Sequence, residues 1–226
     1  MRRNTLSGFL PLLRVRARKA TVSQQPSSMS VFAQYSSQQH QQCSSIERVS
    51  CRRFRLESPP DTWRLGAALA RLARPGDVFL LQGSLGAGKT TLARGFIQEF
   101  LNDPELEVVS PTYLLDVTYP DYENKAKVPG VVLHHLDLYR LENADDRPIA
   151  DFADIFTHQI CLVEWPERLG KYSTPEEFLQ IRFSFVAGAD GPRVIESSGF
   201  ASHKHLENPR WSQARIDQIQ WQCSAA

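Results

Sequence analysis

Apolar positions in the middle of the chain fall into runs that are typical of buried strands and of helices. Residues 78–81 form a short unbroken apolar run, as expected for a strand that is covered on both faces. Residues 91–101 carry apolar side chains at helical spacing, and Asn102-Asp103-Pro104 marks the end of that helix. Residues 160–163 repeat the buried-strand pattern. The pattern predicts an α/β fold with a central β-sheet flanked by helices.

Weaker patterns extend this prediction on both sides. Ser58-Pro59-Pro60-Asp61 resembles a helix N-terminus, and the apolar spacing after it predicts a helix that ends near Pro75-Gly76. A short helix is predicted at 149–156, and the polar, proline-containing segment 120–130 is expected to be a loop. Further strands are predicted at 54–56, 113–119, 131–136, 179–185 and 193–196, the last two as a hairpin.

Charge divides the chain of 226 residues into chemically different parts. Residues 1–46 contain five Arg and one Lys without any Asp or Glu, whereas the remainder carries 20 basic and 25 acidic residues. Such a basic, Ser-rich segment is typical of an organelle transit peptide, and an ordinary disordered tail is the alternative. The hydrophobic content of 42% suffices for one core, so we expect a single domain at 47–198. Periodicity fades beyond Ser198, which predicts a variable tail at 199–226.

Several protein classes find no support in the sequence. No apolar run approaches the roughly 18 residues of a membrane-spanning helix, and the apolar patch at 9–13 is shorter than a secretory signal requires. Four cysteines without a C-x-x-C spacing indicate neither a zinc site nor a disulfide framework. Cys161 lies within the apolar run 160–163 and is interpreted as a small core residue. We therefore expect no membrane contact and a reducing compartment.

A glycine-rich stretch between the strand-like run and the helix matches a phosphate-binding pattern. Its residues fit G-x-x-x-x-G-K-S/T, in which backbone amides and a helix N-terminus face phosphate oxygens. Lys89 would contact the β and γ phosphates, and Thr90 would place its hydroxyl on Mg²⁺. Because the flanking pattern is right, we predict an ATP/ADP site with Mg²⁺ rather than a chance glycine-rich turn. The predicted nucleotide contacts are Gly83, Ser84, Leu85, Gly86, Ala87, Gly88, Lys89, Thr90 and Thr91.

Two carboxylates stand where a P-loop protein needs one. Asp137 follows the apolar run 131–136, and Glu164 follows 160–163. Both side chains would emerge at the carboxyl edge of a parallel sheet, beside the glycine-rich loop, where a carboxylate can hold Mg²⁺ or orient water. A solvated strand-end acid or a helix cap is the alternative for each. The presence of both favours the functional interpretation.

Two other patterns are weaker. Ser110-Pro111-Thr112-Tyr113 follows the glycine-loop helix, where nucleotide switches often place a hydroxyl, although the tetrapeptide alone favours a plain strand-entry turn. His134 and His135 are neighbours within a predicted strand, so their side chains point to opposite faces and cannot form one metal site. At most one of the two histidines faces the nucleotide.

Four blocks in order carry a family resemblance. They are residues 83–96, Ser110-Pro111-Thr112-Tyr113, His135-Leu136-Asp137-Leu138-Tyr139-Arg140-Leu141 and Val163-Glu164-Trp165-Pro166. Together they resemble the TsaE family, the bacterial-type P-loop ATPases of tRNA threonylcarbamoyladenosine synthesis. The resemblance covers roughly residues 54–185 and implies a single-domain P-loop NTPase-like fold.

The resemblance also implies roles and partners. The chain would act as an ATPase with TsaB- and TsaD-type partners, would reach tRNA only through them, and would not perform the threonylcarbamoyl transfer itself. Thr90 and Glu164 would bind Mg²⁺, and Asp137 would be the second acidic residue and a further metal candidate. Thr112 would be the switch-like hydroxyl and Lys89 the phosphate clamp. The net charge of −5 beyond residue 46 fits indirect contact with tRNA.

Departures from the family and two rival functions remain. The leader 1–46 is extra, the loop 120–130 looks expanded, and 142–158 lacks the expected acidic-Leu-Gly pattern, which puts partner docking in doubt. A transit-like leader suggests a mitochondrion or plastid, or the cytoplasm if it is not a transit peptide. The rivals are a nucleotide-dependent assembly subunit that does not hydrolyse ATP and a small-molecule kinase, whose Arg-bearing lid we do not find in the sequence.

Overall fold

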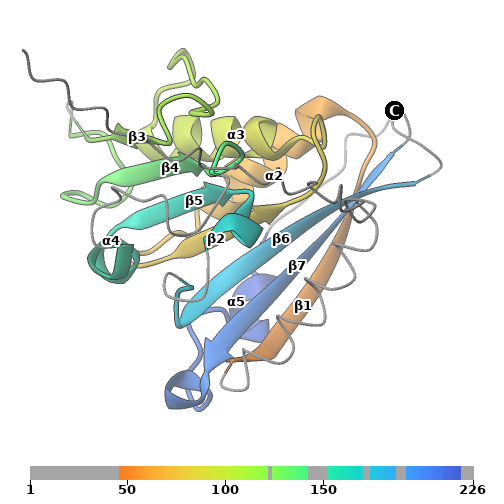
Figure 1. Cartoon of the computed structure of the whole chain (residues 1–226), viewed down its shortest axis with the longest axis vertical. Helices are drawn as coiled ribbons and strands as arrows, with labels where there is room; N and C mark the ends of the chain where they lie inside the picture. Colours follow the sequence, from red (N-terminus) through yellow and green to blue (C-terminus); the bar gives the residue numbers. More distant parts are fainter. Residues whose placement is uncertain (1–45, 122–123, 142–151, 170–173, 187–191, 220–226) are drawn as a thin grey trace, which may run out of the picture. The chain divides into compact units, whose positions relative to one another are not determined.

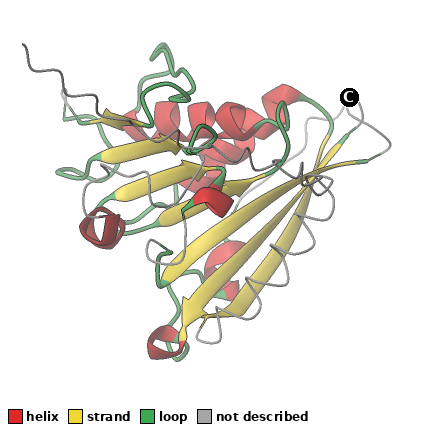
Figure 2. Cartoon of the chain, viewed as in Figure 1, coloured by secondary structure: helices red, strands yellow, loops and turns green. Residues whose placement is uncertain are grey.

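A seven-stranded mixed sheet forms the centre of the protein (Figures 1 and 2). The computed structural model describes residues 46–121, 124–141, 152–169, 174–186 and 192–219, all within one compact unit, 43–226. The strands are β1 (Ile46–Leu56), β2 (Val78–Gln82), β3 (Asp116–Tyr119), β4 (Leu133–Asp137), β5 (Ile160–Glu164), β6 (Glu177–Phe185) and β7 (Arg193–Ser202). The helices are α2 (Pro59–Ala70), α3 (Lys89–Leu101), α4 (Phe152–His158) and α5 (Gln213–Asp217), with 3₁₀ turns η1 (Pro166–Arg168) and η2 (His203–His205).

The middle of the sheet is parallel. The strand order is β1-β7-β6-β2-β5-β4-β3, in which β6, β2, β5 and β4 run parallel and the strands at both sides are antiparallel. The carboxyl ends of β2, β5 and β4 therefore meet at one edge. The glycine-rich loop leaves β2 there, and Asp137 and Glu164 are register partners at the ends of β4 and β5.

Helices cover both faces of this sheet (Figure 1). One core joins α2, α3 and α5 to the sheet around Phe79, Phe96 and Trp211. The other core joins α4 and η1 to the opposite face through Val78, Phe156 and other apolar side chains. Strand β2 is buried on both faces, which explains its unbroken apolar sequence. The predicted α/β, P-loop NTPase-like fold is confirmed.

The two long helices begin and cross as their sequences require. The Asp61 carboxylate accepts hydrogen bonds from the amide and hydroxyl of Ser58 and caps α2 at the predicted position. Helix α2 packs against α3 through Gly66 and Gly95, where an added Cβ would lie 2.1 Å from the Leu92 carbonyl and 2.0 Å from the Trp63 carbonyl, respectively. Helix α3 ends at Leu101, and the next residue, Asn102, has the left-handed backbone (φ 52°) of a C-terminal cap.

Several predicted boundaries were wrong. The strand predicted at 113–119 begins only at Asp116, because residues 112–114 form a turn. The strand predicted at 131–136 is Leu133–Asp137, and the helix expected to end near Pro75-Gly76 ends at Ala70. Strand β1 is much longer than 54–56, and the helix predicted at 149–156 runs from Phe152 to His158, with 149–151 outside the described residues.

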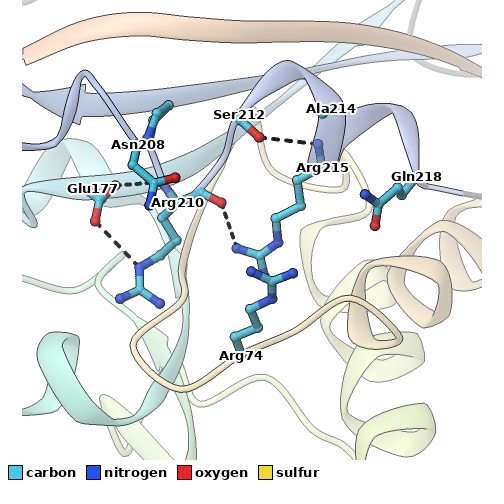
Figure 3. A pocket seen from close by; sticks show the side chains of 9 residues that line it. Arg74, Glu177, Asn208, Arg210, Ser212, Ala214, Arg215 and Gln218 are labelled. Atoms are coloured by element: carbon cyan, nitrogen blue, oxygen red, sulfur yellow. Dashed lines mark hydrogen bonds and ion pairs between the residues drawn. The ribbon is translucent and has the colours of Figure 1, made fainter.

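The chain beyond Ser198 also departs from the predicted tail. Strand β7 continues to Ser202, and Trp211 is completely buried against Phe79. The Arg215 guanidinium forms a buried ion pair with Asp77 and donates to the Leu72 and Arg210 carbonyls, as the close-up of the surrounding cavity shows in part (Figure 3). Through Ile219, this segment therefore belongs to the packed domain.

The structure bears on two features considered from the sequence, membrane-spanning helices and Cys161. In the described part of the chain, no helix combines the length and the apolar character needed to cross a membrane. Cys161 is completely buried between apolar residues, and burial raises the pKa of its thiol far above the ordinary value. Its interpretation as a core residue is confirmed.

Candidate functional site

The glycine-rich loop after β2 forms an open cradle. Gly86 (φ +75°) and Gly88 (φ +107°) have left-handed backbones that favour glycine. Apart from its two chain neighbours, no atom of the described residues lies within 4 Å of a Cβ added to Gly86, so the backbone is open to ligand there. Among the described residues, the amides of Leu85, Gly86 and Gly88 donate to no protein acceptor. The loop thus presents unused N–H groups and the N-terminus of α3 to one point.

Lys89 lies inside this loop. Its side chain is 4% exposed, and Nζ donates to the carbonyls of Gly83 (2.8 Å) and Ser84 (2.9 Å). Nζ also lies 4.1 Å from the ring centre of Trp165, a residue with a left-handed backbone. Burial lowers the pKa of the Lys89 ammonium, although nearby Glu164 and two other carboxylates oppose the shift. This ammonium can donate charge-assisted hydrogen bonds to phosphate oxygens.

Thr90 and Glu164 meet beside the loop. Thr90 Oγ1 donates to Glu164 Oε1 at 2.8 Å, and His135 Nε2 lies 3.0 Å from the same oxygen. Glu164 and His135 are both buried in the sheet, Glu164 at the end of β5 and His135 in the middle of β4. The predicted pair of Thr90 and Glu164 is therefore in direct contact.

Asp137 organises a second group of side chains. Its Oδ2 accepts hydrogen bonds from Ser110 (2.8 Å) and Thr112 (2.6 Å), and its Oδ1 accepts one from the Tyr139 amide (3.0 Å). The segment 110–115 is thereby tied to the end of β4 as a turn. This contact explains why the predicted strand at 113 begins late, since Ser110 and Thr112 are held by a residue far along the chain.

The predicted residues differ in how they reach the site. Lys89, Thr90, Glu164, Asp137 and Thr112 gather at one edge, whereas the Leu85 side chain is 78% exposed, so only its backbone faces the cradle. His134 points the other way and contacts Asp116 Oδ2 at 2.9 Å, as its alternation with His135 predicts.

Other residues at this edge were not singled out from the sequence. Arg193 Nε donates to the Ala87 carbonyl at 3.1 Å and holds the loop from β7, and no local sequence signal indicates this contact. Glu167 lies near Lys89, and burial raises the pKa of its carboxyl against the opposing effect of Lys89. By contrast, His135 was considered from the sequence together with His134; it precedes Asp137 by two residues and so shares its face of the strand, but its contact with Glu164 was not predicted.

The residues present fit magnesium bound together with phosphate. Within the described ranges, no group of three or more His, Cys, Asp or Glu side chains could hold a metal alone. Magnesium does not require such a group, because it usually binds one or two carboxylates together with water and substrate phosphates. The Thr90 hydroxyl and the Glu164 carboxylate are oxygen donors next to the unused amides of the loop. Asp137 already accepts three protein hydrogen bonds and is the weaker candidate ligand.

A protein-family model matches residues 56–190, which include the loop, both carboxylates and Thr112. Its description is threonylcarbamoyl adenosine biosynthesis protein TsaE. The chain belongs to the TsaE family. The predicted resemblance to the TsaE family is confirmed, and the family's description links it to threonylcarbamoyl adenosine biosynthesis.

Individual TsaE relatives agree with this assignment. The chain is similar to the TsaE proteins of Bacillus subtilis (37% identity over 131 residues, 57% of this chain and 75% of that protein) and Treponema pallidum (34% over 149 residues, 61% and 93%). It matches the Rickettsia conorii TsaE at 33% identity over 120 residues, which is 53% of this chain and somewhat less than two thirds (64%) of that protein.

A solved structure has the same fold. The crystal structure of YdiB from Bacillus subtilis aligns with a TM-score of 0.54 and 27% sequence identity. The alignment covers 76% of this chain and 96% of YdiB. The TsaE-type arrangement of the sheet is therefore shared along nearly the whole of that protein.

Proposed function

We propose that the chain binds ATP with Mg²⁺ and hydrolyses it in support of tRNA N6-threonylcarbamoyladenosine synthesis, together with TsaB- and TsaD-type partners. The observation that carries this proposal is the meeting of Lys89, Thr90, Glu164 and Asp137 around a loop in which the amides of Leu85, Gly86 and Gly88 donate to no acceptor among the described residues. Membership of the TsaE family supports the assignment to threonylcarbamoyladenosine synthesis.

Phosphate binding is the first task of the site. The free amides of the loop and the N-terminus of α3 offer hydrogen bonds to oxyanions. The Lys89 ammonium rests on two backbone carbonyls and can exchange these neutral acceptors for charged phosphate oxygens. A phosphate oxygen adds charge–charge attraction that a neutral carbonyl lacks, so this exchange favours the bound state.

Turnover is the second task. Thr90 and Glu164 would hold Mg²⁺, which neutralises charge that develops on the phosphates. The Glu164 carboxylate is fixed through Oε1, and it is the group best placed to accept a proton from water or to orient it. Thr112 and Ser110, held on Asp137, form the segment that would respond to the γ-phosphate.

Indirect contact with tRNA is supported by the charges on β1. Arg53 donates to Glu196, Arg55 pairs with Glu57, and Arg52 donates to backbone carbonyls at the end of α5. These arginines are engaged within the protein, and the chain beyond residue 46 has net charge −5. We therefore propose that partner proteins supply most of the contact with the tRNA backbone.

The leader composition supports a proposal about location. Residues 1–46 are basic and free of acidic residues, as in transit peptides of mitochondria or plastids. A fusion of residues 1–46 to a fluorescent protein, expressed in plant cells, should accumulate in one of these organelles. Diffuse cytoplasmic fluorescence would contradict the proposal.

Steady-state ATP hydrolysis by the full chain tests the proposed activity. The assay compares reactions with and without Mg²⁺ and TsaB- and TsaD-type partners, using Glu164→Ala and, as a control on β7, Glu196→Ala. We expect hydrolysis to appear or rise with the partners, to fall at least about 100-fold in Glu164→Ala, and to persist in Glu196→Ala. Binding of ATP without hydrolysis in every mixture would instead identify a nucleotide-dependent assembly subunit.

A further inference from the structure

His135 is a buried histidine that the proposed mechanism leaves without a role. It lies in β4 on the face that carries Leu133 and Asp137, and its side chain has no exposed surface. Its Nε2 lies 3.0 Å from Glu164 Oε1, the oxygen that also accepts from Thr90. A histidine thus joins the two adjacent strands that carry both acidic residues of the site.

The second ring nitrogen indicates which tautomer is present. His135 Nδ1 is buried and has no hydrogen-bond partner among the described residues. A protonated Nδ1 would leave a buried N–H donor unpaired, whereas a bare Nδ1 leaves only an unused acceptor. The carboxylate can only accept, so the proton belongs on Nε2 and points at Glu164.

We propose that His135 is a positioning residue that fixes the Glu164 carboxylate for magnesium binding and ATP hydrolysis. The inference rests on the proposed function of the site. A glutamate side chain can rotate about its terminal torsion, and two donors on Oε1 restrict that rotation. Thr90 is itself a candidate magnesium ligand through the same hydroxyl oxygen, whereas the His135 ring would serve Glu164 alone. The His135 ring has no other hydrogen-bonding partner among the described residues and is the permanent donor.

Hydrogen-bond partners of metal ligands have a known energetic signature. Their removal commonly lowers metal affinity or activity about 10- to 100-fold while the ligands themselves remain. A core histidine with a merely structural role would instead change stability without changing the dependence on Mg²⁺. The two interpretations therefore differ in a measurable way.

The chain provides matched variants. A Gln side chain can place its amide N–H near the position of His Nε2, whereas an Asn side chain reaches only as far as Nδ1, so His135→Gln should retain the bond that His135→Asn and His135→Leu lose. His134 on the opposite face contacts Asp116 and not the site, which makes His134→Gln the control.

The first measurement is the affinity of each full-length variant for ATP as a function of Mg²⁺, with thermal melting as the check on folding. We expect the Mg²⁺ concentration for half-maximal effect to rise about 10-fold or more in His135→Leu and His135→Asn. It should stay within about three-fold of wild type in His135→Gln and His134→Gln. Affinity for ATP without Mg²⁺ should not change. Equal Mg²⁺ dependence in folded His135→Leu and wild type would overturn the proposal.

Two further readouts keep this test separate from that of the proposed function. Imidazole ¹⁵N spectra of the nucleotide-free chain should show His135 protonated at Nε2, and protonation at Nδ1 alone would refute the inference. In hydrolysis assays, His135→Leu should lower kcat at least about 10-fold and add no further loss to Glu164→Ala. If the wild-type chain never hydrolyses ATP, the proposed activity fails, and the Mg²⁺ titration and the spectra still decide the role of His135.

Discussion

At the scale of single residues, the carboxylate of Asp137 links the segment after α3 to the end of β4. It accepts from two hydroxyls, Ser110 and Thr112, and from the Tyr139 amide. The hydroxyls can rotate and donate or accept, whereas the amide can only donate. An Asn at this position can satisfy all three groups, but it removes the negative charge that strengthens these bonds.

Asp137→Asn should therefore separate binding from turnover. The fold and the affinity for Mg²⁺-ATP should change little, about three-fold or less, while hydrolysis falls about 10- to 100-fold. Calorimetric binding and steady-state hydrolysis on the same preparation check this. An equal loss of affinity and rate would show that Asp137 contributes to ground-state binding instead.

At the scale of elements, α5 depends on one buried ion pair. Arg215 is 4% exposed, and its guanidinium bonds to both oxygens of Asp77, a residue 138 positions earlier in the chain, just before β2. The cavity beside this pair is also lined by Arg74 and Glu177 (Figure 3). Since Arg210 donates to the Pro75 carbonyl and Arg215 to the Leu72 carbonyl, these contacts anchor α5 and the residues before it to the segment between α2 and β2.

Removal of Arg215 should destabilise the domain strongly. Arg215→Leu leaves the Asp77 carboxylate buried without its main partner, so we expect a loss of about 3–5 kcal/mol in the free energy of unfolding. Arg53→Ala removes an exposed surface pair with Glu196 and should leave the free energy of unfolding nearly unchanged. Urea denaturation checks both variants, and similar small losses would show that α5 is not anchored in this way.

A second element-scale contact depends on pH. Glu99 of α3 bonds to Arg71, just after α2, and to Lys127, in the loop between β3 and β4, at 3.1 Å each. Burial alone would raise the pKa of Glu99, but hydrogen bonds from Lys127 and Arg71 outweigh it and hold the pKa below its ordinary value. A depressed folded-state pKa means that the contribution to stability is complete above the unfolded-state pKa of about 4.3. This contribution of Glu99 to stability is lost as the pH falls through its folded-state pKa.

A comparison of Glu99→Gln with wild type should reveal this dependence of stability on pH. The variant should be less stable than wild type by about 0.5–1 kcal/mol near neutral pH, and the difference should shrink toward zero on acidification below about pH 4. Thermal melting across pH 3–7 measures this difference. A gap that stays constant or widens on acidification would contradict the assigned contacts.

At the scale of the whole molecule, local patterns predicted the centre of the fold and the positions of the main site residues. The apolar runs at 78–81 and 160–163 became β2 and β5, and the residues after the runs placed the glycine loop and Glu164 at one edge. These features follow from neighbouring residues and from the geometry of parallel strands.

Features that were mispredicted or missed depend on contacts between distant residues. Asp137 holds Ser110 and Thr112 and delays β3, and Arg215 reaches Asp77 and makes the C-terminal segment part of the core. The partner of His135 is 29 positions away on a neighbouring strand. No local periodicity encodes these pairings, so only the three-dimensional structure reveals them.

The central claim is that the loop between β2 and α3 is a nucleotide site that uses Lys89 and Mg²⁺. Its most direct test is the affinity of the full chain for ATP, with and without Mg²⁺, in wild type and Lys89→Ala, measured by calorimetry. We predict tighter binding with Mg²⁺ in wild type and at least about 100-fold weaker binding in a folded Lys89→Ala variant. Equal affinity of the two proteins for ATP, or no binding by wild type, would contradict the claim.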